Sequence, residues 1–252
     1  MRRAPAWAST PTRVRRSRVV CVRRVRRRTS ATRCRLPVRT LVLGGARSGK
    51  SAWAESLFDA DVSGGATSRR VPVDYVATAR PWPGADGFDS DFSARIAGHR
   101  ERRPAHWRTV DDVDAVEALR RPSAPFVLVD DVGTWLTNVF DREQLWGSPR
   151  GSAAPWTDEL VAAVRDWGGP GSGAGEMRSP TAADPAADGG EAGVVKQEPH
   201  LVIVTPEVGM GVIPEHRSGR LFRDEVGALN GRLADVCDRV VLVVAGLPLT
   251  LK

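Results

Sequence analysis

The sequence predicts a single α/β domain built around a doubly wound, mostly parallel sheet. Short, near-continuous runs of β-branched and aliphatic residues recur between residues 40 and 244, and longer helix-like stretches separate them. Strands of this composition are buried on both faces, as in a parallel sheet covered by helices. A glycine-rich motif of the type G-x-x-x-x-G-K-[ST] follows the first apolar run, which is where a phosphate-binding loop belongs in such a fold.

Five apolar runs, each bounded by turn residues, are the expected strands: 40–44, 73–78, 126–130, 201–205 and 240–244. The stretches between them are mostly long enough for crossover helices, which we expect within 51–60, 91–103, 111–121, 135–144, 156–167 and 215–237. Strands and helices that alternate in this way form right-handed βα crossovers.

Two segments depart from this pattern. Residues 1–38 alternate arginine with small residues and have no periodicity, so we expect a disordered N-terminal extension before a domain of residues 39–252. One hypothesis is that translation begins near Val38 and that the extension is an artefact of the gene model, which N-terminal sequencing of the native protein would test. Residues 168–199 are rich in Gly, Pro, Ala and Asp, and we interpret them as a flexible surface insertion.

The charge of the chain is divided unevenly. The net charge is +7, yet residues 1–39 hold 14 arginines and no acidic residue, which leaves 23 basic against 30 acidic residues in the remainder. A nucleic-acid-binding domain normally carries its basic stripe on the folded surface, so we expect no nucleic-acid partner. The competing hypothesis, a polyanion-binding arginine tail on a vestigial P-loop domain, predicts salt-sensitive DNA binding that disappears when residues 1–38 are deleted.

The apolar runs and cysteines favour a cytoplasmic protein. No stretch approaches the roughly 20 apolar residues of a membrane helix, and the longest apolar run of the tail, residues 19–22, is shorter than the roughly 7–15 residues of a signal peptide. We therefore expect neither export nor membrane insertion. Cys21, Cys34 and Cys237 form no CxxC pair, and we interpret them as reduced thiols.

The motif Gly44-Gly45-Ala46-Arg47-Ser48-Gly49-Lys50-Ser51 predicts a nucleoside triphosphate site. Its glycines allow consecutive backbone N–H groups to turn toward phosphate oxygens, and the helix that follows adds its dipole. Lys50 is expected to reach the β and γ oxygens, and Ser51 to ligate Mg²⁺. The alternative is a glycine-rich turn that only resembles a P-loop.

A carboxylate at the end of a neighbouring strand would complete the metal site. The run "FVLVDD" supplies Asp130, which we expect on the metal or nucleotide side, with Asp131 as the second candidate. The alternative is an aspartate that caps the next helix. A phosphate-binding loop does not identify the acceptor, so kinase and ATPase remain open, whereas the lack of an NKxD-like motif disfavours a regulatory GTPase.

His99 is the candidate nucleophile. In "ARIAGHRERR" it lies one helical turn after Arg95 and is followed by further arginines. The arginines disfavour its cationic form and attract polyphosphate, and a neutral imidazole beside a bound triphosphate can attack phosphorus. The alternative is a surface helix with a solvated positive face.

Several blocks of the sequence resemble one known family. The blocks are, in order, "LVLGGARSGKSAWAE", "YVATA", "SARIAGHRERRPAHWRTVD", "VLVDDVGTWLTN" and "VTPEVGMGVIPEHRSGRLFRDEVGALNGRLADVCDRVVLVVAGLPLTLK". In this order they are similar to the bifunctional adenosylcobinamide kinase / adenosylcobinamide-phosphate guanylyltransferase family of cobalamin biosynthesis. The resemblance covers residues 40–252 apart from the insertion.

The resemblance implies a RecA-like P-loop fold, a homotrimer and two reactions. The first phosphorylates the hydroxyl of adenosylcobinamide with ATP or GTP. In the second, GTP guanylylates a histidine, and adenosylcobinamide phosphate takes the GMP to give adenosylcobinamide-GDP. The family's histidine follows the pattern R-I-x-x-H, which places the GMP-histidine intermediate at His99 and not at His106. An alternative is a small-molecule kinase that lacks the guanylyltransferase activity.

The family's nucleotide contacts also carry over onto this sequence. Beyond the loop 44–51, they fall on Ala77, Thr78, Ala79, Arg100, Glu101, Arg102, Arg103, Asp111 and Asp130. A guanidinium beside His99 would stabilise charge that develops on phosphorus, whereas Asp111 either contacts a base or ribose or begins the next helix.

The block after the fourth predicted strand resembles a substrate or subunit-interface element, or else a structural loop followed by an amphipathic helix. Arg220, Arg223 and Asp224 lie on its helix. Where similar proteins usually have Asn, this chain has Pro206, which removes an amide donor. Gly98, beside His99, is expected to weaken the helix there by roughly 1 kcal/mol.

Overall fold

The computed structural model describes residues 38–60, 72–79, 98, 103–168 and 199–252, all within the unit Arg35–Lys252. Residues 1–37 of the predicted extension, and nearly all of the insertion and of the predicted helix 91–103, lie outside these residues, so these three features and the domain boundaries stay predictions. Val38, the last residue of the predicted extension, is the first residue of a strand. Within the described ranges, no helix is both long enough and apolar enough to cross a bilayer.

A seven-stranded sheet forms the centre of the fold, in the order β3-β2-β4-β5-β1-β6-β7. Every neighbouring pair is parallel except β6 and β7. The strands are β1 (Val38–Gly44), β2 (Val73–Ala77), β3 (Arg108–Val110), β4 (Phe126–Asp130), β5 (His200–Pro206), β6 (Arg239–Val244) and β7 (Leu247–Thr250). The expected mostly parallel, doubly wound sheet is therefore confirmed.

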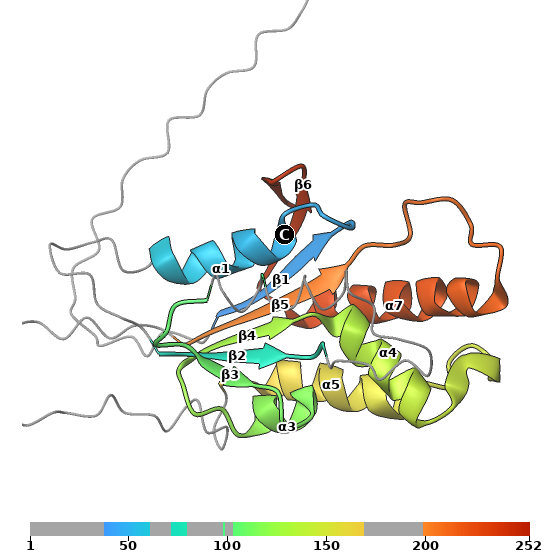
Figure 1. The fold of residues 1–252 in the computed structure, drawn as a ribbon, viewed down its shortest axis with the longest axis horizontal. Coiled ribbons are helices and arrows are strands. Elements are labelled where there is room, and N and C mark those ends of the chain that lie inside the picture. Colours follow the sequence, from blue (N-terminus) through green and yellow to red (C-terminus); the bar gives the residue numbers. More distant parts are fainter. Residues whose placement is uncertain (1–37, 61–71, 80–97, 99–102, 169–198) are drawn as a thin grey trace, which may run out of the picture. The chain divides into compact units, whose positions relative to one another are not determined.

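Helices cover both faces of the sheet (Figure 1). One face carries α1 (Lys50–Ala60), and the other carries α3 (Ala115–Arg120), α4 (Val132–Arg142), α5 (Ala154–Asp166) and α7 (Arg217–Val236), with a short 3-10 turn at Leu145–Gly147. Successive residues of β1 alternate between two cores, since Val42 packs on the α1 side and Leu41 and Leu43 on the other. Burial on both faces explains why the strands are almost continuously apolar.

Two strands, β3 and β7, were not predicted from the sequence. Both lie at edges of the sheet, where strands need less apolar sequence because one side faces solvent. β3 has three residues and begins with the exposed Arg108, and β7 is exposed along its whole length and contains Pro248. Proline is tolerated on such an edge because no ladder hydrogen bond is lost.

Two helices begin where an aspartate caps them and not where the apolar pattern begins. The Asp131 carboxylate accepts a hydrogen bond from the Thr134 backbone at 2.7 Å, so α4 begins at Val132 and not at residue 135. The Asp114 carboxylate accepts one from Val116 at 2.9 Å, so α3 begins at Ala115, four residues later than expected.

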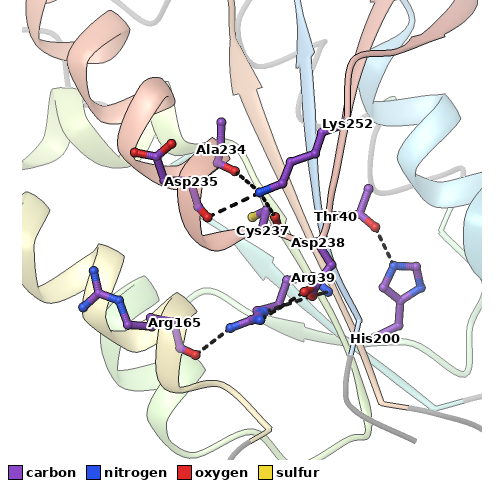
Figure 2. Close-up of polar contacts among 9 residues, drawn as sticks. All are labelled: Arg39, Thr40, Arg165, His200, Ala234, Asp235, Cys237, Asp238 and Lys252. Atoms are coloured by element: carbon purple, nitrogen blue, oxygen red, sulfur yellow. Dashed lines mark hydrogen bonds and ion pairs between the residues drawn. The ribbon is translucent and has the colours of Figure 1, made fainter.

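The amino ends of the central strands are fastened to two helix ends (Figure 2). The Arg39 guanidinium pairs with Asp238 at 3.1 Å and donates to the carbonyl of Arg165, at the end of α5, at 2.6 Å. The Lys252 ammonium donates to carbonyls at the end of α7, among them that of Cys237 at 2.8 Å, where a cation complements the helix dipole. Burial raises the pKa of the Cys237 thiol to about 12, so this thiol is an unreactive core group.

Asp74 is a buried carboxylate that joins three segments. It lies on β2 with 3% of its surface exposed. Its oxygens accept hydrogen bonds from Arg108 Nε on β3 at 3.0 Å and from the backbone N–H groups of Ser123 and Ala124, before β4, at 2.6 and 3.1 Å. Asp74 therefore adds side-chain bonds to the backbone pairing that holds β3 at the edge of the sheet.

Replacing Asp74 by alanine is expected to lower the free energy of unfolding by about 3 kcal/mol, because the backbone N–H of buried Ala124 loses its acceptor and the bonds from Arg108 and Ser123 are lost with it. Urea denaturation measures the change. Asp158→Ala is the control, since its ion pair with Arg232 at 2.5 Å is exposed and should cost less than about 1 kcal/mol. Equal losses of unfolding free energy in the two variants would contradict the role of Asp74 in joining the three segments.

Candidate nucleotide-binding site

The predicted phosphate loop connects the end of β1 to the start of α1, at the carboxyl edge of the sheet (Figure 1). Its backbone requires glycine at two positions. At Gly44, a Cβ would lie 2.4 Å from Ser48 Oγ and 3.0 Å from the carbonyl oxygen of Val243. Gly49 has a φ of 89°, and a Cβ there would lie 3.2 Å from Gly246 Cα. Glycine is thus favoured at Gly44 by steric contacts and at Gly49 by its positive φ together with the close approach of Gly246.

Two backbone hydrogen bonds from distant segments hold the loop. The N–H of Gly246, in the turn between β6 and β7, donates to the carbonyl of Ser48 at 2.8 Å. The N–H of Glu207, just after β5, donates to the carbonyl of Gly44 at 3.0 Å. The Lys50 ammonium lies across the loop, 3.4 Å from the carbonyl oxygen of Gly45, a long contact that a better acceptor can replace.

Asp130, at the end of β4, faces the phosphate loop. Its Oδ1 accepts a hydrogen bond from the Ser51 hydroxyl at 3.0 Å, and its Oδ2 accepts one from the Tyr75 hydroxyl at 2.5 Å. Burial, reinforced by the charge of Asp130, raises the pKa of Tyr75, which therefore stays a proton donor. The strand order brings these groups together, because β5 alone separates β4 from β1.

Asp131 has a different role from Asp130. Its side chain is the N-cap of α4, and burial, followed by the neighbouring charge of Asp130, raises the pKa of its carboxyl group. The sequence allowed two interpretations of this pair of aspartates, a carboxylate for the metal or a helix cap, and each applies to a different residue. Asp130 has the position expected for the metal side, and Asp131 is the cap.

Ala77, Thr78 and Ala79 lie where β2 ends, next to the turn that follows Asp130. Thr78 is 6% exposed, and its hydroxyl oxygen accepts a hydrogen bond from the N–H of Asp131 at 2.9 Å and donates to the carbonyl of Asp131 at 2.7 Å. Asn138, on α4, donates to the carbonyl of Thr78 at 2.9 Å. These contacts hold the turn that carries the carboxylate, and they are internal to the protein.

Arg103 and Asp111 flank the edge strand β3. The Arg103 guanidinium lies over the ring of Tyr75, with 3.5 Å between Cζ and the ring centre, and donates to Thr109 Oγ1 at 3.1 Å. Asp111 follows β3 and is exposed, and because Asp114 caps α3, the alternative that Asp111 begins this helix is wrong. His99, Arg100, Glu101 and Arg102 lie outside the described residues, so their place in the site stays a prediction.

The arginines of the block after β5 bind its own loop. Arg223 donates to the carbonyl of Gly209 at 2.6 Å, and Arg220 donates to that of Pro214 at 3.0 Å. Asp224 pairs with Arg150 at 2.5 Å. Met210, Val212 and Ile213 remain 69–94% exposed on this loop. The loop therefore exposes apolar side chains while hydrogen bonds from the helix arginines hold its backbone.

Pro206 ends β5 and is accommodated by a glycine. A Cβ at position 133 would lie 2.4 Å from the Pro206 ring, so Gly133 makes room for it. The Pro206 carbonyl accepts a hydrogen bond from Asn230 Nδ2 at 3.0 Å. Pro206 therefore packs against Gly133 and accepts a hydrogen bond at the position where similar proteins usually have an asparagine.

The oxygen atoms at the loop fit Mg²⁺ bound together with a nucleotide. Among the described residues, no three His, Cys, Asp or Glu side chains cluster as metal ligands. Ser51 and Asp130 nevertheless place a hydroxyl and a carboxylate 3.0 Å apart, and Mg²⁺ usually takes one or two such oxygens together with phosphates and water.

Contacts that sequence reasoning missed come from segments far apart in the chain. Tyr75 bonds the metal-side carboxylate, and Gly246 supports the phosphate loop. The one tyrosine of the sequence, within an apolar run, was the available signal for the first, because a buried hydroxyl needs a partner. No local pattern indicated the second.

Comparison with known proteins covers the whole described fold. Residues 40–251 match the family described as cobinamide kinase / cobinamide phosphate guanyltransferase. The chain is 34% identical to the bifunctional adenosylcobalamin biosynthesis protein CobP of Pseudomonas aeruginosa. This alignment spans 221 residues, which are 85% of this chain and 98% of the relative. It is 33% identical to the bifunctional adenosylcobalamin biosynthesis protein CobU of Salmonella typhimurium, over 84% of this chain and 98% of the relative, and 33% identical to the Escherichia coli protein of the same name, with the same coverage.

Proposed function

The chain belongs to the cobinamide kinase / cobinamide phosphate guanyltransferase family, and from this premise we propose that it catalyses both reactions on adenosylcobinamide. The first phosphorylates adenosylcobinamide with ATP or GTP. The second transfers GMP from GTP to adenosylcobinamide phosphate and gives adenosylcobinamide-GDP. The resemblance found in the sequence is confirmed, and the bifunctional reading is favoured over a kinase that lacks the second activity.

The observation that carries the kinase half is the juxtaposition of the phosphate loop and Asp130 across β5. Backbone N–H groups of the loop 44–51 and the amino end of α1 bind the phosphates, and Lys50 exchanges its long contact with Gly45 for the β and γ oxygens. The corrinoid hydroxyl attacks the γ-phosphorus, the bond to the β-phosphate oxygen breaks, and the hydroxyl proton leaves to solvent. The nucleoside diphosphate is the leaving group.

Ser51 and Asp130 are the residues proposed to hold Mg²⁺ beside the nucleotide. Their hydroxyl and carboxylate are the oxygen ligands that this ion prefers. When bound, Mg²⁺ neutralises charge on the phosphate oxygens. Asp130 keeps its orientation because both of its oxygens accept hydrogen bonds from the protein.

His99 is the proposed nucleophile of the second reaction. An imidazole nitrogen attacks the α-phosphorus of GTP, the bond to the β-phosphate oxygen breaks, and pyrophosphate leaves. A phosphate oxygen of adenosylcobinamide phosphate then attacks the same phosphorus, breaks the P–N bond and regenerates the histidine. The R-I-x-x-H pattern at Arg95 and the family membership support this role. Exposed Asp111 and the residues 100–103 are proposed nucleotide contacts on the same grounds.

Incubation of the protein with adenosylcobinamide, GTP and Mg²⁺, followed by chromatography of the corrinoids, tests the proposed function. Adenosylcobinamide phosphate should form first, and adenosylcobinamide-GDP should follow with release of pyrophosphate. Accumulation of the phosphate alone would identify the kinase without the second activity, and unchanged adenosylcobinamide would contradict both reactions.

We also propose that the enzyme is a homotrimer that works in the cytoplasm, where ATP and GTP are supplied. Exposed apolar side chains on the β5–α7 loop and on β7 support an assembly, because clustered apolar side chains on a surface often mark a contact with another chain. Those on β7 are Leu247 and Leu249, which are 72% and 56% exposed. Sedimentation equilibrium should give three times the chain mass, and a mass of one chain would contradict the trimer.

A further inference from the structure

Tyr75 is the only tyrosine of the chain and lies on β2 with 1% of its surface exposed. Its hydroxyl donates to Asp130 Oδ2 at 2.5 Å, the length of a charge-assisted bond to an ionised carboxylate. The other oxygen of Asp130 accepts from Ser51 at 3.0 Å. The carboxylate is therefore held from two sides, and one of the two donors is the predicted metal ligand itself.

The ring of Tyr75 is also fixed in place. The Arg103 guanidinium lies 3.5 Å from the ring centre, well inside the range of a cation–π contact, and is itself bonded to Thr109. The indole of Trp107 stacks with the ring at 6.3 Å between centres and an interplanar angle of 29°. A hydroxyl on a ring held in this way has little freedom, and so it sets the direction of the carboxylate that it bonds.

We propose that Tyr75 is a positioning residue for phosphoryl transfer, which orients the Asp130 carboxylate toward Ser51. The inference rests on the proposed function and adds a residue to it. A phenylalanine would fill the same space against Trp107, so packing alone does not require the hydroxyl. Without its bond to Tyr75, Asp130 loses one of the two side-chain hydrogen bonds that orient it toward the loop, and its carboxylate can rotate more easily.

Residues that orient a carboxylate toward a metal typically alter metal affinity or activity by about 10- to 100-fold when they are removed. We therefore expect Tyr75→Phe to lower the kcat of adenosylcobinamide phosphorylation by about 10- to 100-fold, with the KM for adenosylcobinamide changed by less than about twofold.

Binding of a fluorescent ATP analogue without turnover gives a second readout. Its affinity is measured in EDTA and in Mg²⁺, for the wild type and for Tyr75→Phe. We expect equal affinities in EDTA, where Asp130 has no ion to hold, and a smaller gain on adding Mg²⁺ in the variant. A purely structural tyrosine would leave this gain unchanged.

Thr40→Val is the matched control. Thr40 is completely buried, and its hydroxyl lies 2.8 Å from His200 Nε2 near the amino end of β1 (Figure 2). Its loss should lower stability and leave kcat and the Mg²⁺-dependent gain as in the wild type. The control separates the effect of losing any buried hydroxyl from the effect of losing the Tyr75 hydroxyl.

A double-mutant cycle shows whether Tyr75 acts through Asp130. In an Asp130→Asn background, Tyr75→Phe should lower kcat no further. The inference is overturned if Tyr75→Phe has the kcat and Mg²⁺-dependent gain of the wild type, or if its effect is undiminished beside Asp130→Asn. If the wild type fails to phosphorylate adenosylcobinamide while the difference in Mg²⁺-dependent gain is present, the proposed function is wrong and the positioning role stands.

Discussion

Replacement of Lys50 by methionine is expected to lower the kcat of adenosylcobinamide phosphorylation by about 1000-fold, with a small change in stability. A positioned cation that stabilises charge on transferring phosphoryl oxygens contributes an effect of this size. The hydrogen bond from the ammonium to the carbonyl oxygen of Gly45 is long, at 3.4 Å, so the folded protein loses little without it. Initial rates with saturating ATP and Mg²⁺ measure the loss, and thermal unfolding measures the stability.

Lys252→Met is the matched control for Lys50. The Lys252 ammonium also donates to backbone carbonyls, but they lie at the end of α7 (Figure 2). This variant should unfold at a lower temperature and keep the kcat of the wild type. A Lys50→Met variant that loses stability and keeps its kcat would contradict this role, and would mean that another group neutralises the phosphate charge.

Local sequence was sufficient to predict the centre of this fold. The β-branched runs of β1, β4 and β5 are buried on both faces, and burial strongly favours apolar residues there. The phosphate loop was recognisable for a related reason, since a Cβ at Gly44 would clash with Ser48 and the positive φ of Gly49 favours glycine. In both cases the constraint acts on consecutive residues, and so the sequence displays it directly.

The remaining features depend on which strands become neighbours. Val76 pairs with Val129, so β2 brings Tyr75 beside the end of β4 although 55 residues separate Tyr75 from Asp130. Gly246 meets Ser48 because β6 pairs with β1. Neither pairing has a local signature. The division of work between Asp130 and Asp131 likewise follows from which carboxylate turns to the loop and which to the first N–H groups of α4.

Replacement of His99 by alanine is expected to abolish formation of adenosylcobinamide-GDP and to leave the kinase active. Loss of a covalent nucleophile typically costs at least about 1000-fold, whereas phosphoryl transfer uses Lys50, Ser51 and Asp130. Adenosylcobinamide phosphate should therefore accumulate in the variant, and chromatography of the corrinoids measures it. Incubation with GTP labelled at the α-phosphate should give acid-labile label on the wild type and none on the variant.

His106 provides the control that distinguishes the nucleophile from a neighbouring imidazole. It is exposed, lies seven residues after His99 and does not follow the R-I-x-x-H spacing. His106→Ala should therefore retain the label and the complete reaction. Label on His99→Ala would exclude His99 as the intermediate, and its loss from both variants would indicate that guanylylation depends on the charge of this segment. Because the labelling step needs GTP and no corrinoid, it tests the second reaction even in a protein whose kinase half is inactive.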